Sequence, residues 1–312
     1  MTRSRETGDV GYRAYKKNLI INGSLATWQR GTNFPTTDTY KADRWRMSAT
    51  DGAGSIQRVP VAPDVLGLDY SMQPVTSSGT ANMYTALEFV RAGRSILATG
   101  KTYTLSAWVA LSGGQGTGDL QFTVTSRNSQ FDATNQVVML SAVVSPSVSG
   151  YTRLEASFVA LAANGTNEIL QVTISGIPYQ AVITGIQLEE GSSATPFEYV
   201  SPQENLAACQ RYFERIVVVN NNIATTGQVV NTSAAISILN YTVKRATPTV
   251  TFSSGFVTTT ALGAAAGGTP GADITGLTSA RISMTGAAGL VGGNATCLVH
   301  PTSGFIDVDA EL

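Results

Sequence analysis

The side chains of this sequence that could do chemistry at a surface are aromatic and polar residues of the kind that bind sugars. An exposed ring covers the apolar face of a sugar, while amide, carboxylate or guanidinium groups bind its hydroxyls. The candidate rings are Trp28, Tyr40, Trp45, Tyr84, Trp108 and Tyr179. The three tryptophans fall in expected strands, so we assign them to the core, whereas Tyr40 and Tyr179 lie near expected turns.

The candidate ligand-binding residues are therefore the two tyrosines near turns and two charged neighbours of Trp45, namely Tyr40, Asp43, Arg44 and Tyr179. A carboxylate and a guanidinium next to an aromatic residue can bind sugar hydroxyls as acceptor and donor. For Arg44 the alternative is an internal ion pair with Asp43 or another carboxylate. The glycan itself is not identified by these residues.

No set of catalytic residues stands out. The single histidine, His300, would have to be the base of any Ser-His-Asp triad, and no Gly-x-Ser-x-Gly motif occurs. Glu189 and Glu190 could form the carboxylate pair of a glycoside hydrolase, but neighbouring residues of a strand point to opposite faces. Gly100–Thr102 lacks the first glycine of a phosphate-binding loop, because Ser95 stands there. We therefore expect a protein that is not an enzyme.

The composition also limits cofactors and partners. The chain of 312 residues has a net charge of −1, which gives no electrostatic footprint for nucleic acid. No Cys-x-x-Cys motif occurs, so we expect no zinc site and no cofactor; Cys209 and Cys297 could be a disulfide or two free thiols. Charged residues make up 13%, about half the usual share. Such a composition favours an extracellular or virion all-β protein.

The chain begins with a polar, basic stretch, residues 1–17. No apolar segment of the signal-peptide kind follows Met1–Gly8, and no run of about 18 apolar residues occurs anywhere, so we expect no membrane insertion. We interpret the stretch as an N-terminal arm that anchors the protein to a partner through its cations, which are Arg3, Arg5, Arg13, Lys16 and Lys17. A solvated arm without a partner is the alternative.

Strand patterns dominate residues 18–200. Large and small side chains alternate with period two between turn signals that recur roughly every ten residues. The expected strands are Tyr103–Val109, Leu120–Thr125, Gln136–Val144, Thr152–Phe158, Ile169–Ile174 and Val182–Leu188. We expect the first two to form a hairpin with a long tip. Asn18–Gly31 reads as strand, turn, strand, because Asn22-Gly23 favours a tight turn. The pattern predicts a jelly-roll β-sandwich.

Residues 201–215 are expected to connect the sandwich to a second domain. Ser201, Pro202 and Glu204 form a capping box with proline at the first helical position, which predicts a helix over Gln203–Cys209. A strand, Gln210–Val219, should follow. Residues 216–312 are expected to form a smaller C-terminal β-domain, so the fold class is all-β. Its expected strands are Val229–Leu239, Thr249–Phe252 and Phe305–Leu312.

Eight short segments in order carry a family resemblance over residues 18 to about 215 and again at the C-terminus. They are Asn18–Ser24, Trp28–Gly31, Tyr40–Trp45, Tyr103–Trp108, Ile183–Gly191, Ala194–Glu198, Leu206–Glu214 and Asp309–Leu312, and over residues 216–312 the segment Lys244–Val250 also matches. These segments resemble bacteriophage and prophage tail proteins with a carbohydrate-binding-module-like jelly roll of the galactose-binding type. The chain departs from that pattern at Ser24 and Leu25, where Asp and Phe are usual, and we expect no metal here.

The resemblance implies a virion structural protein, a tail fibre that forms a homotrimer and binds a host cell-surface glycan. The arm would attach it to other virion proteins of the phage. The expected location is the virion, after synthesis in the host cytoplasm without a signal peptide. One alternative is a head fibre or decoration protein on the capsid. A second is a polysaccharide depolymerase.

Overall fold

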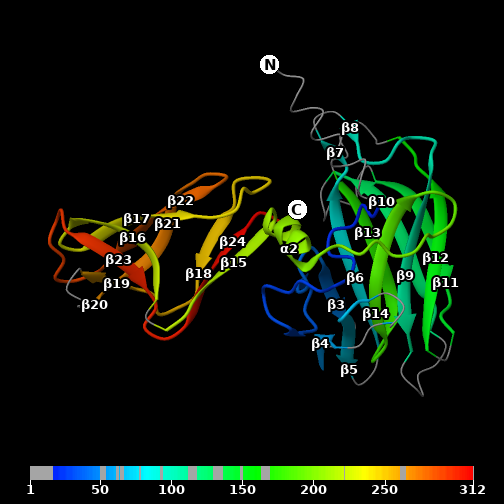
Figure 1. The fold of residues 1–312 in the computed structure, drawn as a ribbon, viewed down its shortest axis with the longest axis horizontal. Coiled ribbons are helices and arrows are strands. Elements are labelled where there is room, and N and C mark those ends of the chain that lie inside the picture. The colour runs from blue at the N-terminus through cyan, green and yellow to red at the C-terminus, as the bar shows by residue number, and fades with distance from the viewer. Residues whose placement is uncertain are drawn as a thin grey trace. The chain divides into compact units, whose positions relative to one another are not determined.

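The structure is a computed structural model that forms two compact units, Met1–Asn205 and Leu206–Glu311 (Figure 1). It describes residues 17–311 except 50–53, 61–62, 64–66, 77–78, 92–93, 112–117, 129–135, 148–149, 163–168, 221 and 261–264. In these described ranges the regular structure consists of strands and one α-helix, α2 (Pro202–Gln210). The predicted all-β fold class is confirmed. Of the arm, only Lys17 falls within the described residues.

The N-terminal unit contains two six-stranded antiparallel sheets. The first sheet has the order β1 (Asn33–Pro35), β4 (Gly54–Val59), β5 (Ser71–Thr76), β14 (Val182–Glu190), β9 (Thr102–Ala110) and β12 (Tyr151–Val159). The second sheet has the order β11 (Val137–Val144), β10 (Leu120–Arg127), β13 (Ile169–Pro178), β6 (Thr80–Glu88), β3 (Arg46–Ala49) and β2 (Thr39–Tyr40). A short ribbon, β7 (Val90–Arg91) with β8 (Arg94–Ser95), stands beside them. Two antiparallel sheets packed face to face are consistent with the predicted jelly-roll sandwich.

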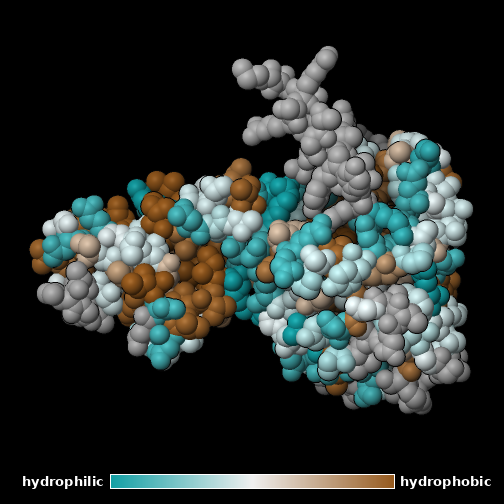
Figure 2. Space-filling model, viewed as in Figure 1, coloured by the Kyte–Doolittle hydropathy of each residue, from teal (hydrophilic) through white to brown (hydrophobic). Residues whose placement is uncertain are grey.

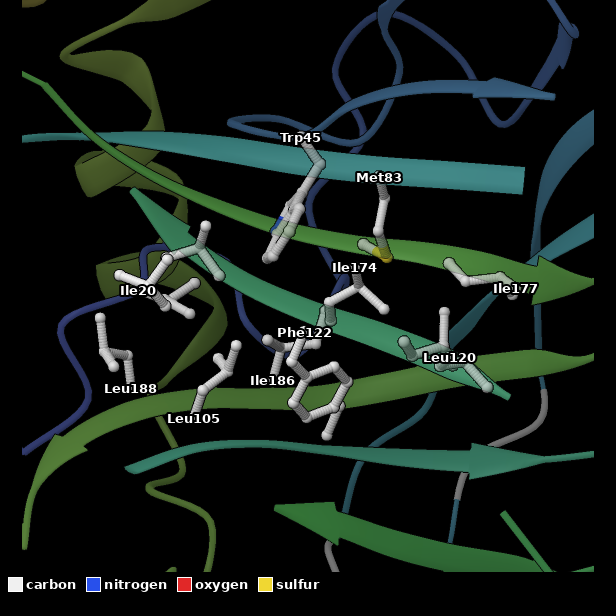
Figure 3. Packing of buried hydrophobic residues seen from close by; sticks show 14 of the residues in the cluster. Ile20, Trp45, Met83, Leu105, Leu120, Phe122, Ile174, Ile177, Ile186 and Leu188 are labelled. Atoms are coloured by element: carbon white, nitrogen blue, oxygen red, sulfur yellow. The ribbon is translucent and has the colours of Figure 1, made fainter. Parts of the chain in front are cut away.

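The core of this unit lies between the two sheets. Alternate residues of each strand point inward, so one strand supplies a row of apolar side chains. Leu105 and Leu188 of the first sheet belong to the same buried cluster as Phe122 and Ile174 of the second (Figure 3). Trp45, which is fully buried, packs into that cluster. Close packing of this kind holds the two sheets together.

The expected hairpin between the strands at Tyr103–Val109 and Leu120–Thr125 is wrong. β9 pairs with β12 and β14 in the first sheet, whereas β10 pairs with β11 and β13 in the second. Packed sheets lie about 10 Å apart, and the connection 111–119 is long enough to cross that distance. Alternation identifies a strand, but it does not say which sheet the strand joins.

The expected strands within Asn18–Gly31 are also wrong, because isolated backbone hydrogen bonds (Leu19 N to the Leu188 carbonyl, Ile186 N to the Gly23 carbonyl) and polar side chains join this segment to β14 without a regular ladder. Asn18 lies against β14: its Oδ1 accepts the N–H groups of Ile20 (3.0 Å) and Leu188 (3.1 Å). Its Nδ2 donates to the carbonyl of Ile186 at 3.0 Å. Gly23 follows, where an added Cβ would lie 2.0 Å from the Ile186 oxygen. The segment can approach β14 this closely only with glycine at that position.

Asn22, which lies between Asn18 and Gly23 in sequence, is the centre of a buried hydrogen-bond network. Its Oδ1 accepts from Thr27 N (3.1 Å) and Asn205 Nδ2 (2.9 Å), and its Nδ2 donates to the carbonyls of Thr27 and Asp43, both at 2.9 Å. Its own carbonyl accepts the indole N–H of Trp45 at 3.0 Å. The backbone is left-handed, with φ of 57°, a conformation that asparagine tolerates better than most residues.

The predicted helix is confirmed. The hydroxyl of Ser201 accepts the backbone N–H of Glu204 at 3.3 Å, as expected of an N-cap, and the helix runs over Pro202–Gln210. Asn205, in its first turns, donates to Thr27 Oγ1 at 2.7 Å as well as to Asn22. The helix start is thereby joined to the beginning of the sandwich.

The C-terminal unit contains a three-stranded and a seven-stranded sheet. The first has the order β15 (Phe213–Val218), β24 (Gly304–Asp309) and β18 (Thr249–Phe252). The second has the order β20 (Ala265–Gly267), β19 (Val257–Thr260), β23 (Ala295–Val299), β16 (Ile223–Asn231), β17 (Ala234–Asn240), β22 (Ser279–Thr285) and β21 (Thr269–Thr275). The strand predicted at Thr249–Phe252 is confirmed, and so is the C-terminal one. The single strand predicted at Val229–Leu239 is wrong, because a turn at residues 232–233 divides it into β16 and β17.

This unit has its own core and a partly apolar surface. Val229, Leu239, Ile282 and Ile306 are among its buried residues. Hydrophobic residues also lie at its surface (Figure 2), and those with more than half of their area exposed are Val217, Val219, Ile223, Val230, Ile238, Val243, Ile274 and Val291. Both cysteines lie in the described part of the chain, and no disulfide joins them: Cys209 is buried and Cys297 half-buried.

Replacing Asn22 tests the network directly. Asn22→Gly keeps the left-handed backbone but leaves buried amide groups without partners, so we expect the N-terminal unit to lose about 2–4 kcal/mol of unfolding free energy. Asn22→Ala should cost about 1 kcal/mol more, because a Cβ disfavours positive φ. All three tryptophans lie in this unit, so their fluorescence in urea follows its unfolding. Equal stability of Asn22→Gly and the parent protein would contradict the role given to the carboxamide.

Candidate functional site

A row of polar side chains crosses the outer face of the second sheet. Directly opposed residues of antiparallel strands share a face, and the register places one residue from each of the six strands in line. This outer row consists of Tyr40, Arg46, Tyr84, Thr173, Thr123 and Ser141. With strands about 4.8 Å apart, the row is about 24 Å long.

The outer row points away from the core. The residues next to its members in sequence, such as Met47, Met83 and Phe122, are fully buried in the hydrophobic cluster. The row itself is half-buried, and Ser141 at its end is exposed. It therefore presents hydroxyl groups, two phenol rings and a guanidinium on one side of the sandwich.

Asp38, which precedes β2, organises the aromatic end of the row. The hydroxyl of Tyr84 donates to both carboxylate oxygens of Asp38 at 3.0 Å. Nε of Arg46 donates to Oδ1 at 2.9 Å, and its guanidinium carbon lies 5.8 Å from the centre of the Tyr84 ring. The carboxylate remains 43% exposed, so it can accept further hydrogen bonds from a ligand. Asp38 and Arg46 thus form an ion pair without net charge, and the ring of Tyr84 lies beside it.

Burial and the Asp38 carboxylate keep the Tyr84 phenol in its neutral form. Burial is the larger cause that raises the pKa of Tyr84, and the hydrogen bond to Asp38 and its negative charge add to it. Tyr84 is therefore a hydrogen-bond donor to Asp38 at all physiological pH values. This orients the carboxylate toward the ring instead of leaving it free to rotate.

Lys41 supports the loop that carries Asp38. Its side chain is fully buried, and its ammonium donates to the carbonyl of Thr37 at 2.7 Å and to Thr39 Oγ1 at 3.0 Å. It lies 5.6 Å from the centre of the Phe34 ring. Burial lowers the pKa of Lys41 to about 8, although the negative charge of Asp38 opposes that shift. The ammonium is thus bound at both sides of Asp38.

Lys41 makes stability depend on pH. Its pKa falls from 10.5 in the unfolded chain to about 8 in the folded one, so the unfolded state binds more protons between these values and stability rises with pH there. We expect a gain on the order of 2 kcal/mol from pH 7.5 to 10, absent in Lys41→Met. Urea unfolding at the two pH values, followed by tryptophan fluorescence, measures it. If the parent protein and Lys41→Met gained the same unfolding free energy, titration of other groups would be its cause.

Two of the sequence-predicted ligand residues lie inside the protein. The side chain of Asp43 is fully buried, accepts from Gln29 Nε2 at 2.6 Å and lies 3.6 Å from Arg30 Nη1. Arg44 is buried with φ of 70° and donates to the carbonyl of Ala86. The ion pair of Asp43 is with Arg30, and neither Asp43 nor Arg44 reaches the surface where a sugar would bind.

The two predicted tyrosines are not brought together. Tyr40 is a member of the outer row, half-buried, with the Arg30 guanidinium 5.2 Å from its ring centre. Tyr179 lies in the turn between β13 and β14, six positions along the chain from Thr173 of the row. At about 3.3 Å per residue, Tyr179 is roughly 20 Å away along the strand direction. A ligand role for Tyr40 stays a prediction that the row favours.

The sequence did not identify Asp38 and Arg46 as site residues, and Tyr84 was only one of six aromatic candidates. The assignment of Trp28 and Trp45 to the core is confirmed, since they are 7% and 0% exposed. Trp108 is different: it is half-buried and stands opposite Arg153 and Thr184 on the outer side of the first sheet. In β9 the neighbours of Trp108, Ala107 and Val109, point into the core, so Trp108 points outward. Its assignment to the core was therefore wrong.

The predicted anchoring residues Arg3, Arg5, Arg13 and Lys16 lie outside the described residues. Lys17 is described: it donates to the carbonyl of Pro196 at 2.9 Å and lies 3.8 Å from Glu189. Glu189 is buried and Glu190 exposed, as expected for neighbours on a strand. Burial disfavours ionisation of Glu189, but hydrogen bonds from Thr195 and Gln187, and then Lys17, outweigh it and lower its pKa. Glu189 thus has a structural role at the end of β14.

No other chemical centre is evident in the described ranges. They contain no group of three or more His, Cys, Asp or Glu side chains close enough to hold a metal ion. His300 is buried, with Nε2 2.8 Å from the carbonyl of Ser254 and Nδ1 3.4 Å from the hydroxyl of Thr302. Among the helices described here, none has the length and apolar character needed to cross a membrane.

No protein-family model matches the chain, and no curated protein sequence does. Among solved structures, similar chains include a Clostridium thermocellum xylanase 10B fragment with CBM22-1 and GH10 modules, at 16% identity over 60% of this chain and 30% of that one, TM-score 0.34. The CBM22-2 xylan-binding domain of Paenibacillus barcinonensis Xyn10C matches at 15% identity over 51% and 98%, TM-score 0.33. The active domain of bacteriophage CBA120 tailspike protein 4 matches at 13% identity over 56% and 21%, TM-score 0.37. This chain thus spans less than a third of the xylanase and tailspike chains.

Proposed function

We propose that the N-terminal unit binds a glycan chain along the outer row of the second sheet. The observation that carries this proposal is the cluster at its aromatic end, where Asp38 orients both Tyr84 and Arg46. A ring beside a carboxylate and a guanidinium meets the needs of a sugar, which has an apolar face and hydroxyls on its rim. The threonine and serine hydroxyls further along the row can donate and accept.

The length and charge of the row define the kind of glycan. A site about 24 Å long, built from one residue of each strand, has room for several consecutive sugar rings. Arg46 of the row and Asp38 beside it neutralise each other, so the site has no net charge to attract or repel a ligand. We therefore propose a linear, predominantly neutral oligosaccharide or polysaccharide as the ligand.

For the whole chain, we propose a non-enzymatic structural protein of a bacteriophage virion, most simply a trimeric tail fibre that binds a host surface glycan. Support comes from the eight ordered motifs of residues 18–215 and the C-terminus, and from the charge-poor composition. The exposed valines and isoleucines of the C-terminal unit support self-association, because large exposed apolar areas favour contact between chains. A capsid-attached head fibre or decoration protein would use the same parts.

Replacing Tyr84 tests the glycan site. Tyr84→Ala removes the ring and the partner of Asp38, and we expect at least a tenfold loss of affinity, about 1.4 kcal/mol. Asp38→Asn should weaken binding less, because the ring stays. Tyr199→Ala is the matched control, since Tyr199 is 60% exposed and outside the row. Binding is measured by calorimetry with the best neutral oligosaccharide from a glycan array. Equal losses in Tyr84→Ala and Tyr199→Ala would place the site elsewhere.

The mass in solution tests the trimer. We expect sedimentation equilibrium to give a multiple of three times the 32.6 kDa of one chain. Tethered sites raise avidity through effective concentration, so the assembled protein should adhere to a glycan-coated surface more strongly than one site binds free sugar. A monomer at all concentrations, or a mass that is not a multiple of three chains, would reject the trimer while leaving the sugar site intact.

A further inference from the structure

β11 is a long edge strand that contains neither charge nor proline. Its eight residues, Val137–Val144, contain no charged residue and no proline, and in the part of the chain that the structure describes it pairs only with β10. It lies at the margin of the sandwich (Figure 1). One row of its backbone N–H and C=O groups therefore has no ladder partner in the described ranges, and β12 of the first sheet lies next to the strand without pairing with it. Proteins ordinarily protect such edges with charges, prolines or very short strands, because an open edge pairs readily with another chain.

The other three edges of the sandwich are protected in these ways. β2 has two residues and β1 has three, of which one is Pro35. β12 is long but contains two charged residues: Arg153 donates to the carbonyl of Ala194, and Glu155 accepts the N–H of that residue. These contacts hold the segment after β14 against β12. Among the described edges, β11 alone combines length with a complete lack of charge.

The side chains of β11 are those of a contact surface. Val143 is 66% exposed and Val138 is 47% exposed, although valine ordinarily gains free energy from burial. Leu140 points into the core, whereas Ser141 lies in the outer row. A register shift relative to β10, opposite Val124 and Thr125, interrupts the strand before Leu140. Regular pairing is therefore available over Leu140–Val144.

We propose that β11 pairs antiparallel with β11 of a second copy of this chain, across a two-fold axis, so that the two second sheets become one continuous sheet. Inward residues must meet inward residues, and full overlap of the regular stretch Leu140–Val144 then centres the axis on Ala142. Leu140 then lies opposite Val144 of the second copy, and Ser141 lies opposite Val143. A second copy is the partner that this strand fits, because a strand without charge can meet itself without electrostatic repulsion, and an isologous contact needs no other surface.

The pairing is independent of a trimer formed elsewhere on the chain. Each chain of a trimer would still have its own β11 edge, so two trimers could join edge to edge as two monomers could. If the proposed glycan site is correct, pairing has a further consequence that rests on it. Ser141 ends the outer row at this edge, so two rows would lie side by side on one face and could bind the same polysaccharide.

Sedimentation velocity of the full chain over a range of concentrations tests the pairing without any ligand. Val143→Lys places two ammonium groups close to the axis, and we expect it to halve the mass of the wild-type protein, from two chains to one or from six to three. Val159→Lys is the matched control, because Val159 is 52% exposed on the protected edge strand β12; it should sediment as wild type. Tryptophan fluorescence confirms that both variants are folded.

A covalent trap gives a second, independent measurement. In the double variant Ser141→Cys, Val143→Cys, opposed residues of the two copies come within the range of a disulfide, so mild oxidation should give a two-chain band on a non-reducing gel. The parent protein, which already contains Cys209 and Cys297, is the control. A mass that Val143→Lys leaves unchanged, or that Val159→Lys halves equally, would overturn the pairing. Halving of the mass in a protein that binds no glycan would support the pairing and reject only the sugar site.

Discussion

The N-terminal unit depends on one buried carboxamide, that of Asn22. Its oxygen and nitrogen bind Thr27, Asp43 and Asn205 of helix α2, and its backbone carbonyl binds the indole of Trp45. A side chain at this place must both donate and accept, and its backbone must tolerate a left-handed conformation. Asparagine meets both requirements. A buried network in which every group has a partner specifies one arrangement, because each alternative leaves polar groups unpaired.

The network also determines where the candidate site lies. Trp45, fixed by Asn22, is buried in the core, and the next residue, Arg46, begins β3 and points to the outer face. The loop before it contains Asp38 and is held by the buried ammonium of Lys41. The carboxylate, the guanidinium and the ring of Tyr84 are therefore positioned by contacts beneath the surface. Such support from the interior is what gives a binding site a defined geometry.

Much of the fold can be predicted from the sequence, because a β-strand has a local pattern of alternating side chains. Period-two alternation located β9 to β14 within a few residues, and the capping box located the helix. Two of the failures are nonlocal and one is local. Alternation could not show that β9 and β10 belong to different sheets. Asn18–Gly31 has strand-like residues, but isolated backbone bonds and side chains hold it against β14 without a ladder. Val229–Leu239 failed because Thr232-Ser233 is a weak turn signal.

The site was harder to predict than the fold for the same reason. Tyr40, Arg46 and Tyr84 are distant in sequence, and only the register of three strands aligns them. Asp43 and Arg44 were predicted to bind a ligand because they are charged and lie close to a tryptophan in sequence. A charged residue next to an aromatic one in sequence can have either of two roles. If exposed, it can bind a ligand; if buried, it forms internal hydrogen bonds or ion pairs. In this structure both Asp43 and Arg44 are buried.

The proposed chemistry of the row suggests why the rest of the chain would favour assembly. A site with one well-oriented ring and neutral overall charge gains little from electrostatic steering, so a single copy should hold a glycan weakly. Repeated copies on one particle raise the effective concentration of sites without any new contact to the sugar. In the proposed assemblies, the apolar surface of the C-terminal unit and the uncharged edge of β11 would both bring copies together at little electrostatic cost. A weak site on a self-associating scaffold can then hold a repetitive polymer firmly, while each individual contact remains easily reversible.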